Sequence, residues 1–445
     1  MKLDEHPTVK RVRANQPDTA SQESQVLDAG WLRQCALEAG ADDVGFVEIE
    51  RPELDDQRDD LMRCYPATKT LVSFVVRMNR EPIRNAARSV ANLEFHRAGD
   101  EVNDTARKIV RALEERSVRA INPAMGFPME MQRFPGKIWV VSHKRVAVAA
   151  GLGRMGIHRN IIHPKFGNFI LLGTVLIDAE VSEHGKPIDY NPCLECKLCV
   201  ATCPVGAISS DGHFNFSACY THNYREFMGG FTDWVEKVSE SRSPTDYRNR
   251  VSDAESASMW QSLSYGANYK AAYCLSVCPA GEDVIGPYLA DKKTHLKENV
   301  RPLQEKAETV YVVPGSDAED HIAKRFPNKR SKHVGNGLHP RTVDQFLQGL
   351  PLVFQRNKSE GLDATYHFTF TGNEQRKVTV VIRNKTLTVT EGHDGDADLR
   401  IAADTQTWLG FLAKEKSLVW ALLRRKIRLK GPPRLLVAFG KCFPS

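Results

Sequence analysis

Four cysteines in the middle of the chain have the spacing of an iron–sulfur site. Residues 193–204 read Cys-Leu-Glu-Cys-Lys-Leu-Cys-Val-Ala-Thr-Cys-Pro. This is the C-x₂-C-x₂-C-x₃-C-P run of bacterial-type [4Fe–4S] proteins, in which the fourth cysteine binds the other cluster of a two-cluster protein. A zinc knuckle normally pairs two Cys-x₂-Cys hooks instead of chaining three. The spacing therefore predicts iron–sulfur chemistry at Cys193, Cys196, Cys199 and Cys203.

A second set of cysteines follows, and it is incomplete. Cys278 precedes a proline, as Cys203 does, so by the crossed-ligand rule Cys278 is expected to be the fourth ligand of the first cluster. Three residues before Cys274, where a full motif has a further cysteine, the chain has Ala271. The second cluster is therefore either [3Fe–4S], or [4Fe–4S] with a non-cysteine ligand such as His222 or water. The thiolates left for it are Cys203, Cys219 and Cys274.

Composition limits the class of protein. The chain has 445 residues, room for two or three domains, and 41% of them are hydrophobic, enough for real cores. The formal net charge of +6 is weak evidence for an anionic partner. We expect no transmembrane segment, because no apolar run reaches 18 residues, and no secretory leader. Since clusters must mature under reducing conditions, the expected location is cytoplasmic.

The first segment, from about residue 21 to residue 181, has the pattern of an α/β domain. The short apolar runs Leu71–Val76 and Phe169–Ile177 are typical of buried strands, and apolar residues recur at helical spacing over 102–113. The run 150–160 contains three glycines, which let the backbone approach a ligand or another element closely. A dinucleotide fingerprint would follow a strand, whereas alanine-rich residues before this run indicate a helix, so that interpretation is disfavoured.

The cluster segment runs from about residue 189 to residue 287. Phe227, Phe231 and Trp234 suggest an amphipathic helix that shields a cluster from water. The stretch 314–340 is polar and has little periodicity, which is typical of a linker.

The third segment, from about residue 342 to the end, predicts strands by alternation. Tyr366, Phe368 and Phe370 alternate with polar residues, and a hairpin turn is expected at Asn384-Lys385. Asp404 is a good helix N-cap. Residues 426–430 predict a strand with one apolar and one basic face; the basic face is either simply solvated or a membrane-surface patch.

Residues 30–290 resemble the group of epoxyqueuosine reductases and reductive dehalogenases. The resemblance is carried by the glycine run 150–156, by the run 166–168 before the strand near Leu172, and by the cysteine region. Members of this group carry cobalamin in an α/β domain beside two [4Fe–4S] clusters, which implies that electrons pass through the clusters to cobalt. The resemblance also implies that the corrin is bordered by Gly151, Gly153, Gly156, His158, Arg159 and Asn160.

The chain departs from this group at the proton donor. Epoxyqueuosine reductases have an acidic residue shortly before the glycine motif, and residues 139–145 contain none. Histidine titrates near neutral pH and can replace a carboxylic acid, so His143 is the candidate catalytic residue. The alternative is a surface histidine beside two cations. The missing acid disfavours the tRNA reaction.

The last hundred residues resemble sterol-carrier-type lipid-binding domains in the order of their predicted elements. This resemblance implies an apolar tunnel, and the alternative is that the same side chains simply fill the core. The candidate lining residues are Trp408, Phe411, Leu412, Trp420, Leu423, Leu436 and Phe439.

These patterns predict an α/β multidomain protein that combines an α/β cofactor domain, a two-cluster ferredoxin-like domain and a C-terminal α+β sterol-carrier-like domain. The expected boundaries are a disordered tail over 1–25, the reductase-like domain over 26–185, the ferredoxin-like domain over 186–290, a linker over 291–341 and the lipid-binding domain over 342–445.

The predicted function is an iron–sulfur oxidoreductase that relays electrons through two clusters, with cobalamin as the implied acceptor. The expected partners are a small apolar or lipid-like substrate and a reductase or ferredoxin as electron donor, with no nucleic acid. The alternatives are a non-catalytic electron carrier or redox sensor that carries a lipid-binding module, and a lipid-binding protein whose clusters are structural.

Overall fold

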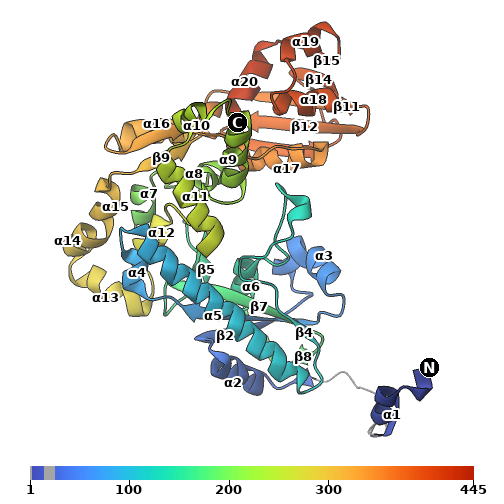
Figure 1. The fold of residues 1–445 in the computed structure, drawn as a ribbon, viewed down its shortest axis with the longest axis vertical. Coiled ribbons are helices and arrows are strands. Elements are labelled where there is room, and N and C mark those ends of the chain that lie inside the picture. Colours follow the sequence, from blue (N-terminus) through green and yellow to red (C-terminus); the bar gives the residue numbers. More distant parts are fainter. Residues whose placement is uncertain (1–2, 15–25, 445) are drawn as a thin grey trace.

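The computed structural model describes residues 3–14 and 26–444, and Figure 1 shows their arrangement. A four-stranded antiparallel sheet of order β2-β3-β7-β4 forms the centre of the N-terminal part. Its two middle strands are almost entirely buried, as the apolar runs predict. The strands are β2 (Asp43–Glu48), β3 (Thr70–Arg77), β4 (Ala120–Ile121) and β7 (Ile170–Ile177).

Helices cover both faces of this sheet. On one face, α2 (Ala29–Ala39) and the long α5 (Arg88–Glu114) pack their apolar sides against the strands. On the other face lie α3 (Asp55–Cys64) and α6 (His143–Ala149). The sequence also sets the ends of these helices: the Asp28 carboxylate accepts a hydrogen bond from the first turn of α2. This three-layer unit fits the predicted mixed α/β architecture.

Two short pairings complete this part. Strand β1 (Val26–Leu27) pairs in parallel with β8 (Glu180–Val181), and β5 (Arg154–Met155) forms a hairpin with β6 (Ile161–Ile162). Helix α4 (Arg80–Arg84) precedes α5. Of the predicted N-terminal tail, Leu3–Glu5 and α1 (Pro7–Ala14) are helical without any buried side chain, and residues 15–25 lie outside the described part.

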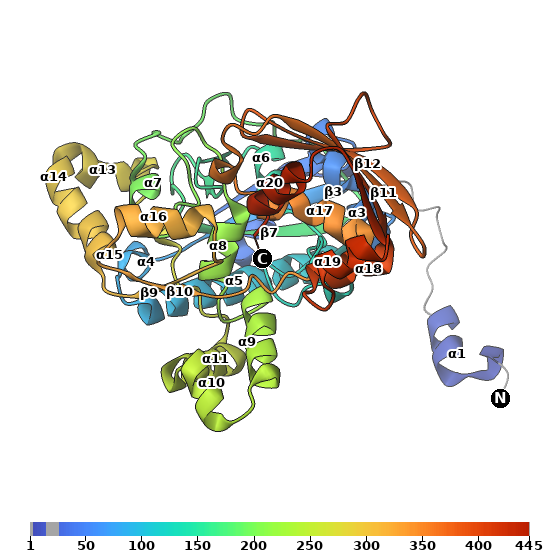
Figure 2. The ribbon, with the colours of Figure 1, turned by 90° about the horizontal axis from the view of Figure 1, so that it is seen from above.

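The cluster region is mainly helical. Figure 2 shows that α9, α10 and α11 project from the body as an arm. Helix α13 packs against the core of the sheet unit through Val284. The helices of this region are α7 (Leu198–Thr202), α8 (Phe216–Asn223), α9 (Gly229–Glu240), α10 (Pro244–Arg250), α11 (Asp253–Tyr265), α12 (Tyr273–Ser276), α13 (Glu282–Ala290), α14 (Lys292–His295) and α15 (Arg301–Glu305).

The predicted linker over 291–341 is instead a folded unit. Beyond α14 and α15, strand β9 (Thr309–Val312), helix α16 (Asp317–Arg325) and strand β10 (Arg330–His333) form a β-α-β arrangement with parallel strands. Val310, Val312 and Ile322 pack in one core with Cys203 and its neighbours. The linker prediction failed because only a few apolar residues of these short elements are buried, and the rest of the stretch is polar.

The C-terminal region is a five-stranded sheet of order β13-β12-β11-β14-β15. As predicted, Asn384 and Lys385 form the hairpin turn, both with positive φ, and the Asp404 carboxylate caps the following helix. The elements are α17 (Val343–Val353), β11 (Ala364–Thr371), β12 (Arg376–Arg383), β13 (Thr386–Glu391), β14 (Leu399–Asp404), α18 (Thr405–Leu412), α19 (Leu418–Leu423), β15 (Ile427–Lys430) and α20 (Arg434–Cys442).

The side chains proposed to line an apolar tunnel divide into two groups. Trp408 and Phe439 are buried in the core of this sheet, whereas Trp420 and Leu423 are exposed on α19. The region is attached to the cluster region through polar contacts, including an ion pair of 2.6 Å between Arg356 and Asp211. No helix in the part of the chain that the structure describes is both long and apolar enough to cross a bilayer.

We expect Trp408→Ala to destabilise the C-terminal region by about 3–5 kcal/mol, because the indole is 1% exposed and its ring contacts those of Phe346 and Phe368. Trp420→Ala, in the same region but 62% exposed, should change stability by less than about 0.5 kcal/mol. Denaturant unfolding of both variants measures the difference; equal shifts would contradict the assignment of Trp408 to the core.

Candidate functional site

The first cysteine group surrounds a small pocket between the cluster loop and the chain after α12. The loop can wrap around this pocket because Glu195 and Lys197 adopt left-handed conformations, with φ of 48° and 62°. The chain therefore brings the three closely spaced cysteines and the distant Cys278 together, in agreement with the crossed-ligand rule. The cysteines that line this pocket are Cys193, Cys196, Cys199 and Cys278.

These thiols are in an environment that disfavours charge. Burial, together with the neighbouring Cys196 and Cys193, raises the pKa of Cys278 to about 12. Burial and the surrounding cysteines also raise the pKa of Cys199. Thiolates packed this closely need positive charge beside them, and the iron atoms of a cluster would supply it. The donor set thus fits a [4Fe–4S] cluster.

The second cysteine group opens onto a larger cavity. Cys203, Cys219 and Cys274 all line it. The sulfur of Cys203 accepts a hydrogen bond from the backbone N–H of Ala207 at 3.3 Å. The sulfur of Cys274 is 3.9 Å from Nδ2 of Asn160, which donates to it. Hydrogen bonds of this kind to ligand sulfurs tune the reduction potential of a cluster.

The position of the missing cysteine faces the same cavity. Ala271 is 6% exposed and lines the cavity, and its backbone N–H donates to Oδ1 of Asn223 at 3.0 Å. The second site therefore has three thiols in the structure. Among the described residues, no three His, Cys, Asp or Glu side chains form a site for a single metal ion.

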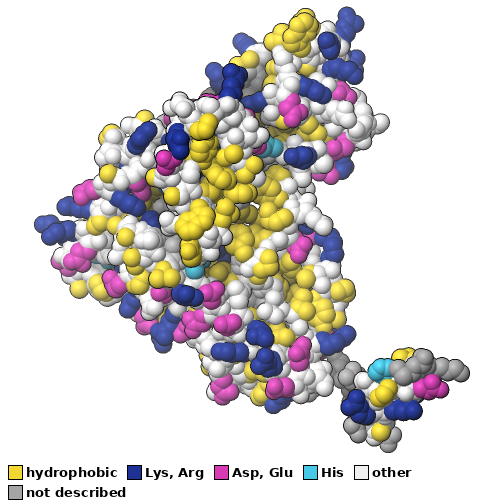
Figure 3. All heavy atoms as spheres, viewed as in Figure 1, with side chains coloured by type: hydrophobic (Ala, Val, Ile, Leu, Met, Phe, Trp, Pro, Cys, Tyr) yellow, Lys and Arg dark blue, Asp and Glu magenta, His cyan; other side chains and the backbone are white. Residues whose placement is uncertain are grey.

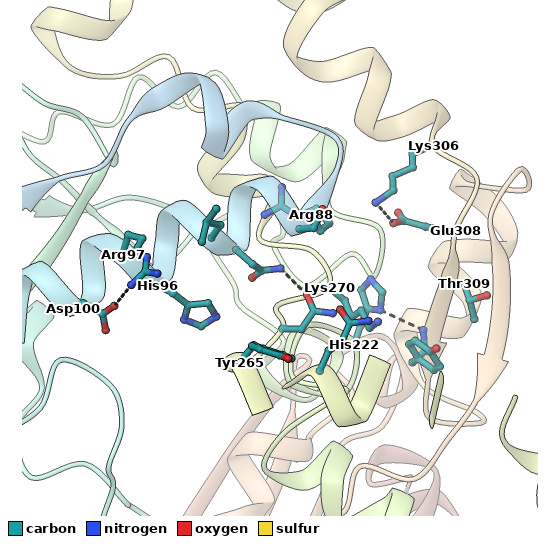
Figure 4. Close-up of a pocket in the computed structure, with 17 residues that line it drawn as sticks. Arg88, His96, Arg97, Asp100, His222, Tyr265, Lys270, Lys306, Glu308 and Thr309 are labelled. Carbon is teal, nitrogen blue, oxygen red and sulfur yellow. Dashed lines mark hydrogen bonds and ion pairs between the residues drawn. The ribbon is translucent and has the colours of Figure 1, made fainter. Parts of the chain in front are cut away.

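His222, the suggested substitute ligand, lies on α8 three residues after Cys219. Its Nδ1 accepts a hydrogen bond from the backbone N–H of Tyr311 at 3.4 Å, and its Nε2 has no partner. Burial lowers the pKa of this imidazole to about 4, so that the ring is neutral at neutral pH. It lines both the second-cluster cavity and an adjoining polar pocket, which Figure 4 shows.

The second-cluster cavity has a volume of about 530 Å³. Its cationic side chains are Arg88, Lys144 and Arg159, and none of its described lining residues is Asp or Glu. Figure 3 shows hydrophobic side chains gathered around a hollow on this face of the molecule. The aromatic lining residues are Phe95, Phe127, Trp139, Phe214, Phe216, Tyr220, Tyr224, Tyr269 and Tyr273.

A loop over 122–142 forms one side of this cavity, through Met125, Phe127 and Trp139 among others. Asp60 of α3 holds the loop by ion pairs with Lys137 and, at 3.1 Å, with Arg133. The hydrogen bond from Lys137 is the main reason that the pKa of Asp60 falls to about 2. The Asp60 carboxylate therefore stays ionised at neutral pH, and its ion pairs keep the loop over 122–142 attached to α3.

The three glycines of the sequence motif do not line the cavity. A Cβ at Gly151 would lie 2.6 Å from the backbone oxygen of Lys186, and one at Gly153 would lie 2.5 Å from that of Ile162. Both glycines also have positive φ, of 83° and 158°. Gly156 likewise packs against Ile162 and the His158 ring. Gly153 and Gly156 thus allow close packing within the β5–β6 hairpin, and Gly151 allows the close approach of the chain at Lys186.

The residues after the glycines do reach the cavity. His158, Arg159 and Asn160 all line it, and His158 also borders the pocket of the first cysteine group. Lys144 Nζ donates to the backbone oxygen of Arg159 at 2.7 Å and to Oδ1 of Asn160 at 2.9 Å. Burial, together with the charge of Lys144, lowers the pKa of His158 to about 4. This turn connects the two cysteine groups.

His143 lines the cavity, but its ring nitrogens are both engaged. Nε2 donates to the backbone oxygen of Ala124 at 3.1 Å, which leaves Nδ1 to accept from the Thr174 hydroxyl at 2.9 Å. Burial lowers its pKa below the usual range. This arrangement positions the ring and leaves no free proton for a substrate.

Sequence reasoning missed Lys144 and Tyr269, which have no local motif and reach the cavity only in the tertiary structure.

Two families match parts of the chain. Residues 186–209 match the 4Fe-4S binding domain, and residues 338–444 match the alkyl sulfatase C-terminal domain. The first match agrees with the predicted cluster region. The second falls on the region expected to resemble sterol carriers, for which lipid binding stays a prediction.

Curated relatives are epoxyqueuosine reductases. The protein of Cellulophaga algicola is 22% identical over 244 residues, which cover 49% of this chain and 76% of that protein. The Vibrio cholerae protein is 23% identical over 230 residues, which cover 45% of this chain and 59% of that protein. The Staphylococcus aureus protein is 34% identical over 80 residues, only 18% of this chain and 20% of that protein. These relatives confirm the expectation of an iron–sulfur oxidoreductase.

Solved structures show similarity at low TM-scores. An epoxyqueuosine reductase with an epoxyqueuosine-modified tRNA-Tyr stem loop has 16% identity and a TM-score of 0.36, over 67% of this chain and 81% of that chain. A B12-dependent reductive dehalogenase has 16% identity and a TM-score of 0.39, over 71% of this chain and 39% of that chain. The sec-alkylsulfatase Pisa1 from Pseudomonas sp. has 24% identity and a TM-score of 0.22, over 26% of this chain and 18% of that chain.

These comparisons overturn the prediction about partners. A small apolar substrate with no nucleic acid was expected, but the curated relatives are epoxyqueuosine reductases, the group whose tRNA reaction the missing acid was taken to disfavour. The prediction was wrong because it relied on net charge and on one missing acidic residue. Neither feature reports which substrate a cavity admits, since local charge and shape decide that.

Cys278→Ala and Cys219→Ala should each remove a different cluster. Because the two cysteines belong to separate groups, each substitution is expected to lower the iron content by roughly half and to abolish a different EPR signal. Cys64→Ala, at an exposed thiol outside both groups, is the control and should keep all the iron. Loss of the same signal in both variants would contradict two separate sites.

Proposed function

We propose that this protein is an iron–sulfur oxidoreductase whose electrons pass from the first cluster, at Cys278 and the cysteine motif, to the second cluster and then to an acceptor in the cavity. One observation supports this order above the others: the second cysteine group opens onto the cavity, whereas the first group lies behind it, separated by His158. Asn160, which donates to the sulfur of Cys274, belongs to the same turn.

We further propose cobalamin as the acceptor. When bound, it supplies a cobalt centre that takes up single electrons and then acts as a strong nucleophile or reductant. The residues present suit a large, amide-bearing ligand: aromatic walls offer flat apolar contact, and Lys144, Arg159 and Asn160 offer polar groups along one rim. None of the described lining residues is a carboxylate, so the charged side chains of the cavity other than the cluster thiolates are cationic.

Tyr269 is the proposed proton donor, in place of the acidic residue that the sequence lacks. It lines the cavity, and burial raises its pKa to about 12, so the phenol stays protonated at neutral pH. Two other cavity tyrosines have bonded hydroxyls: that of Tyr273 donates to Glu308 at 2.6 Å, and that of Tyr220 accepts from the backbone of Gly229 at 2.8 Å. Tyr224 has no such bond, but burial raises its pKa well above the usual value, so Tyr269 is the proposed donor.

The cofactor proposal is tested by anaerobic reconstitution. Protein with a full complement of iron is mixed with hydroxocobalamin and passed through a gel-filtration column. We expect corrin absorbance to stay with the protein at about one cobalt per chain. The same experiment with Cys219→Ala checks whether retention depends on the neighbouring cluster. Protein that keeps its iron but emerges free of cobalt would remove cobalamin from the mechanism.

A second candidate function is redox sensing without substrate turnover. The observation that favours it is the three-thiol second site, because a cluster with an iron atom not held by cysteine is open to exchange. In this case the redox state of the second cluster, instead of a chemical product, would be the output of the protein.

Ala271→Cys tests the composition of the second site. Since Ala271 lines the same cavity as Cys203, Cys219 and Cys274, the new thiol is expected to become a fourth ligand and to change the EPR spectrum of the second cluster only. The control is Ala272→Cys, at the adjacent cavity-lining position. An unchanged spectrum in Ala271→Cys, or the same change in both variants, would show that a cysteine at 271 is not a ligand.

A further inference from the structure

A polar pocket of about 640 Å³ adjoins the second-cluster cavity. Helix α5, the end of α11 and strand β9 contribute to its walls, as Figure 4 shows. Arg88, Asn92 and His222 line both the pocket and the cavity. These three residues therefore mark the place where the two spaces meet, and a ligand could extend from one space into the other there.

His222 presents a hydrogen-bond donor at this junction. A backbone N–H can only donate, so the contact from Tyr311 makes Nδ1 of His222 the acceptor. The neutral ring must then carry its hydrogen on Nε2. The side chain is 1% exposed, and Nε2 has no acceptor among the described residues. Buried donors without partners are rare in native proteins, and each calls for an explanation.

Arg88 presents a second unpaired donor. Its guanidinium lies 5.5 Å from the centre of the Tyr273 ring, and Nη1 donates to the backbone oxygen of Asn85 at 3.3 Å. The buried Nε has no acceptor, and Arg88 forms no ion pair within the described ranges. The nearest acidic neighbour in the pocket, Glu308, is already bonded to Lys329 at 2.8 Å and pairs with Lys306 at 3.3 Å.

The other cations of the pocket are compensated. Lys270 pairs with Glu226, and Arg97 pairs with Asp100 at 3.4 Å. Arg88 thus differs from them in having no ion pair among the described residues, and it lines the same junction as the unmatched donor of His222. Arg in particular recognises carboxylate and phosphate oxygens, because its planar fork matches their geometry.

We infer that the junction between the two cavities binds an oxyanion, a carboxylate or a phosphate, through Arg88 and His222. This inference rests on the proposed function and extends it to the substrate class: an organic acid or phosphate ester whose anionic group lies in the polar pocket while its reducible part enters the cavity. The anion supplies the acceptors that Nε of Arg88 and Nε2 of His222 lack, and it balances the charge of Arg88.

The test is anaerobic calorimetry on cluster-loaded protein with three probes: inorganic phosphate, guanosine 5′-monophosphate and benzoate. At least one probe is expected to bind the unchanged protein, and the probe that binds distinguishes a phosphate from a carboxylate ligand. Arg88→Gln and His222→Phe should each weaken its binding, by at least about tenfold for Arg88→Gln, because a charge-assisted hydrogen bond is lost. Arg88→Lys should give an intermediate affinity.

Arg97→Gln is the matched control, because Arg97 lines the same pocket but is exposed and already paired. Its affinity should equal that of the unchanged protein. No binding of any probe, or an equal loss in Arg97→Gln, overturns the inference. Iron content is measured on each sample; if Arg88→Gln or His222→Phe loses its clusters, the affinity of Arg88→Lys decides. If the clusters are intact and reducible but no anion binds, only the anion site is refuted. If an anion binds but the protein cannot take up electrons, only the proposed function is refuted.

Discussion

The structure depends on keeping buried sulfur atoms close together. Burial raises the pKa of the thiols in both groups, as at Cys278 and Cys274, and neighbouring cysteines add to the effect. Such an arrangement is favourable only when a positively charged metal centre binds the thiolates. The fold must therefore bring three separate stretches of chain to the same place: the cysteine motif, the middle of α8 and the residues around α12.

Much of the remaining architecture supports this assembly. The β9-α16-β10 unit packs against Cys203 from one side, and the three-layer sheet unit supplies α5 and the turn at 158–160 from the other. The polar side chains of this region have separate roles. Lys144 and Asn160 serve the cavity and the sulfur of Cys274, while Arg88 and His222 stand where that cavity meets the polar pocket. One ligand can thus have an anionic end and a reducible end in different surroundings.

The C-terminal sheet has a different character from the redox region. Its core is a cluster of aromatic rings around Trp408, and none of the seven cluster cysteines belongs to it. It is joined to the redox region by polar contacts such as that between Arg356 and Asp211. This construction suits a separately folded unit attached to an electron-transfer region.

The sequence by itself determined the features that depend on local spacing. Cysteine intervals identified the first ligand set and the incomplete second one, apolar runs identified β3 and β7, and Asn384-Lys385 identified a hairpin turn, because neighbouring residues fix these patterns. Only the tertiary structure decided which side chains meet across long separations. It assigned the glycines to close backbone packing, engaged both nitrogens of His143, folded residues 309–333, and placed Arg88 and His222 at one junction between two cavities. Such contacts join segments that are far apart in the sequence, and no local pattern links those segments. Their burial and charge balance arise only when the chain is packed.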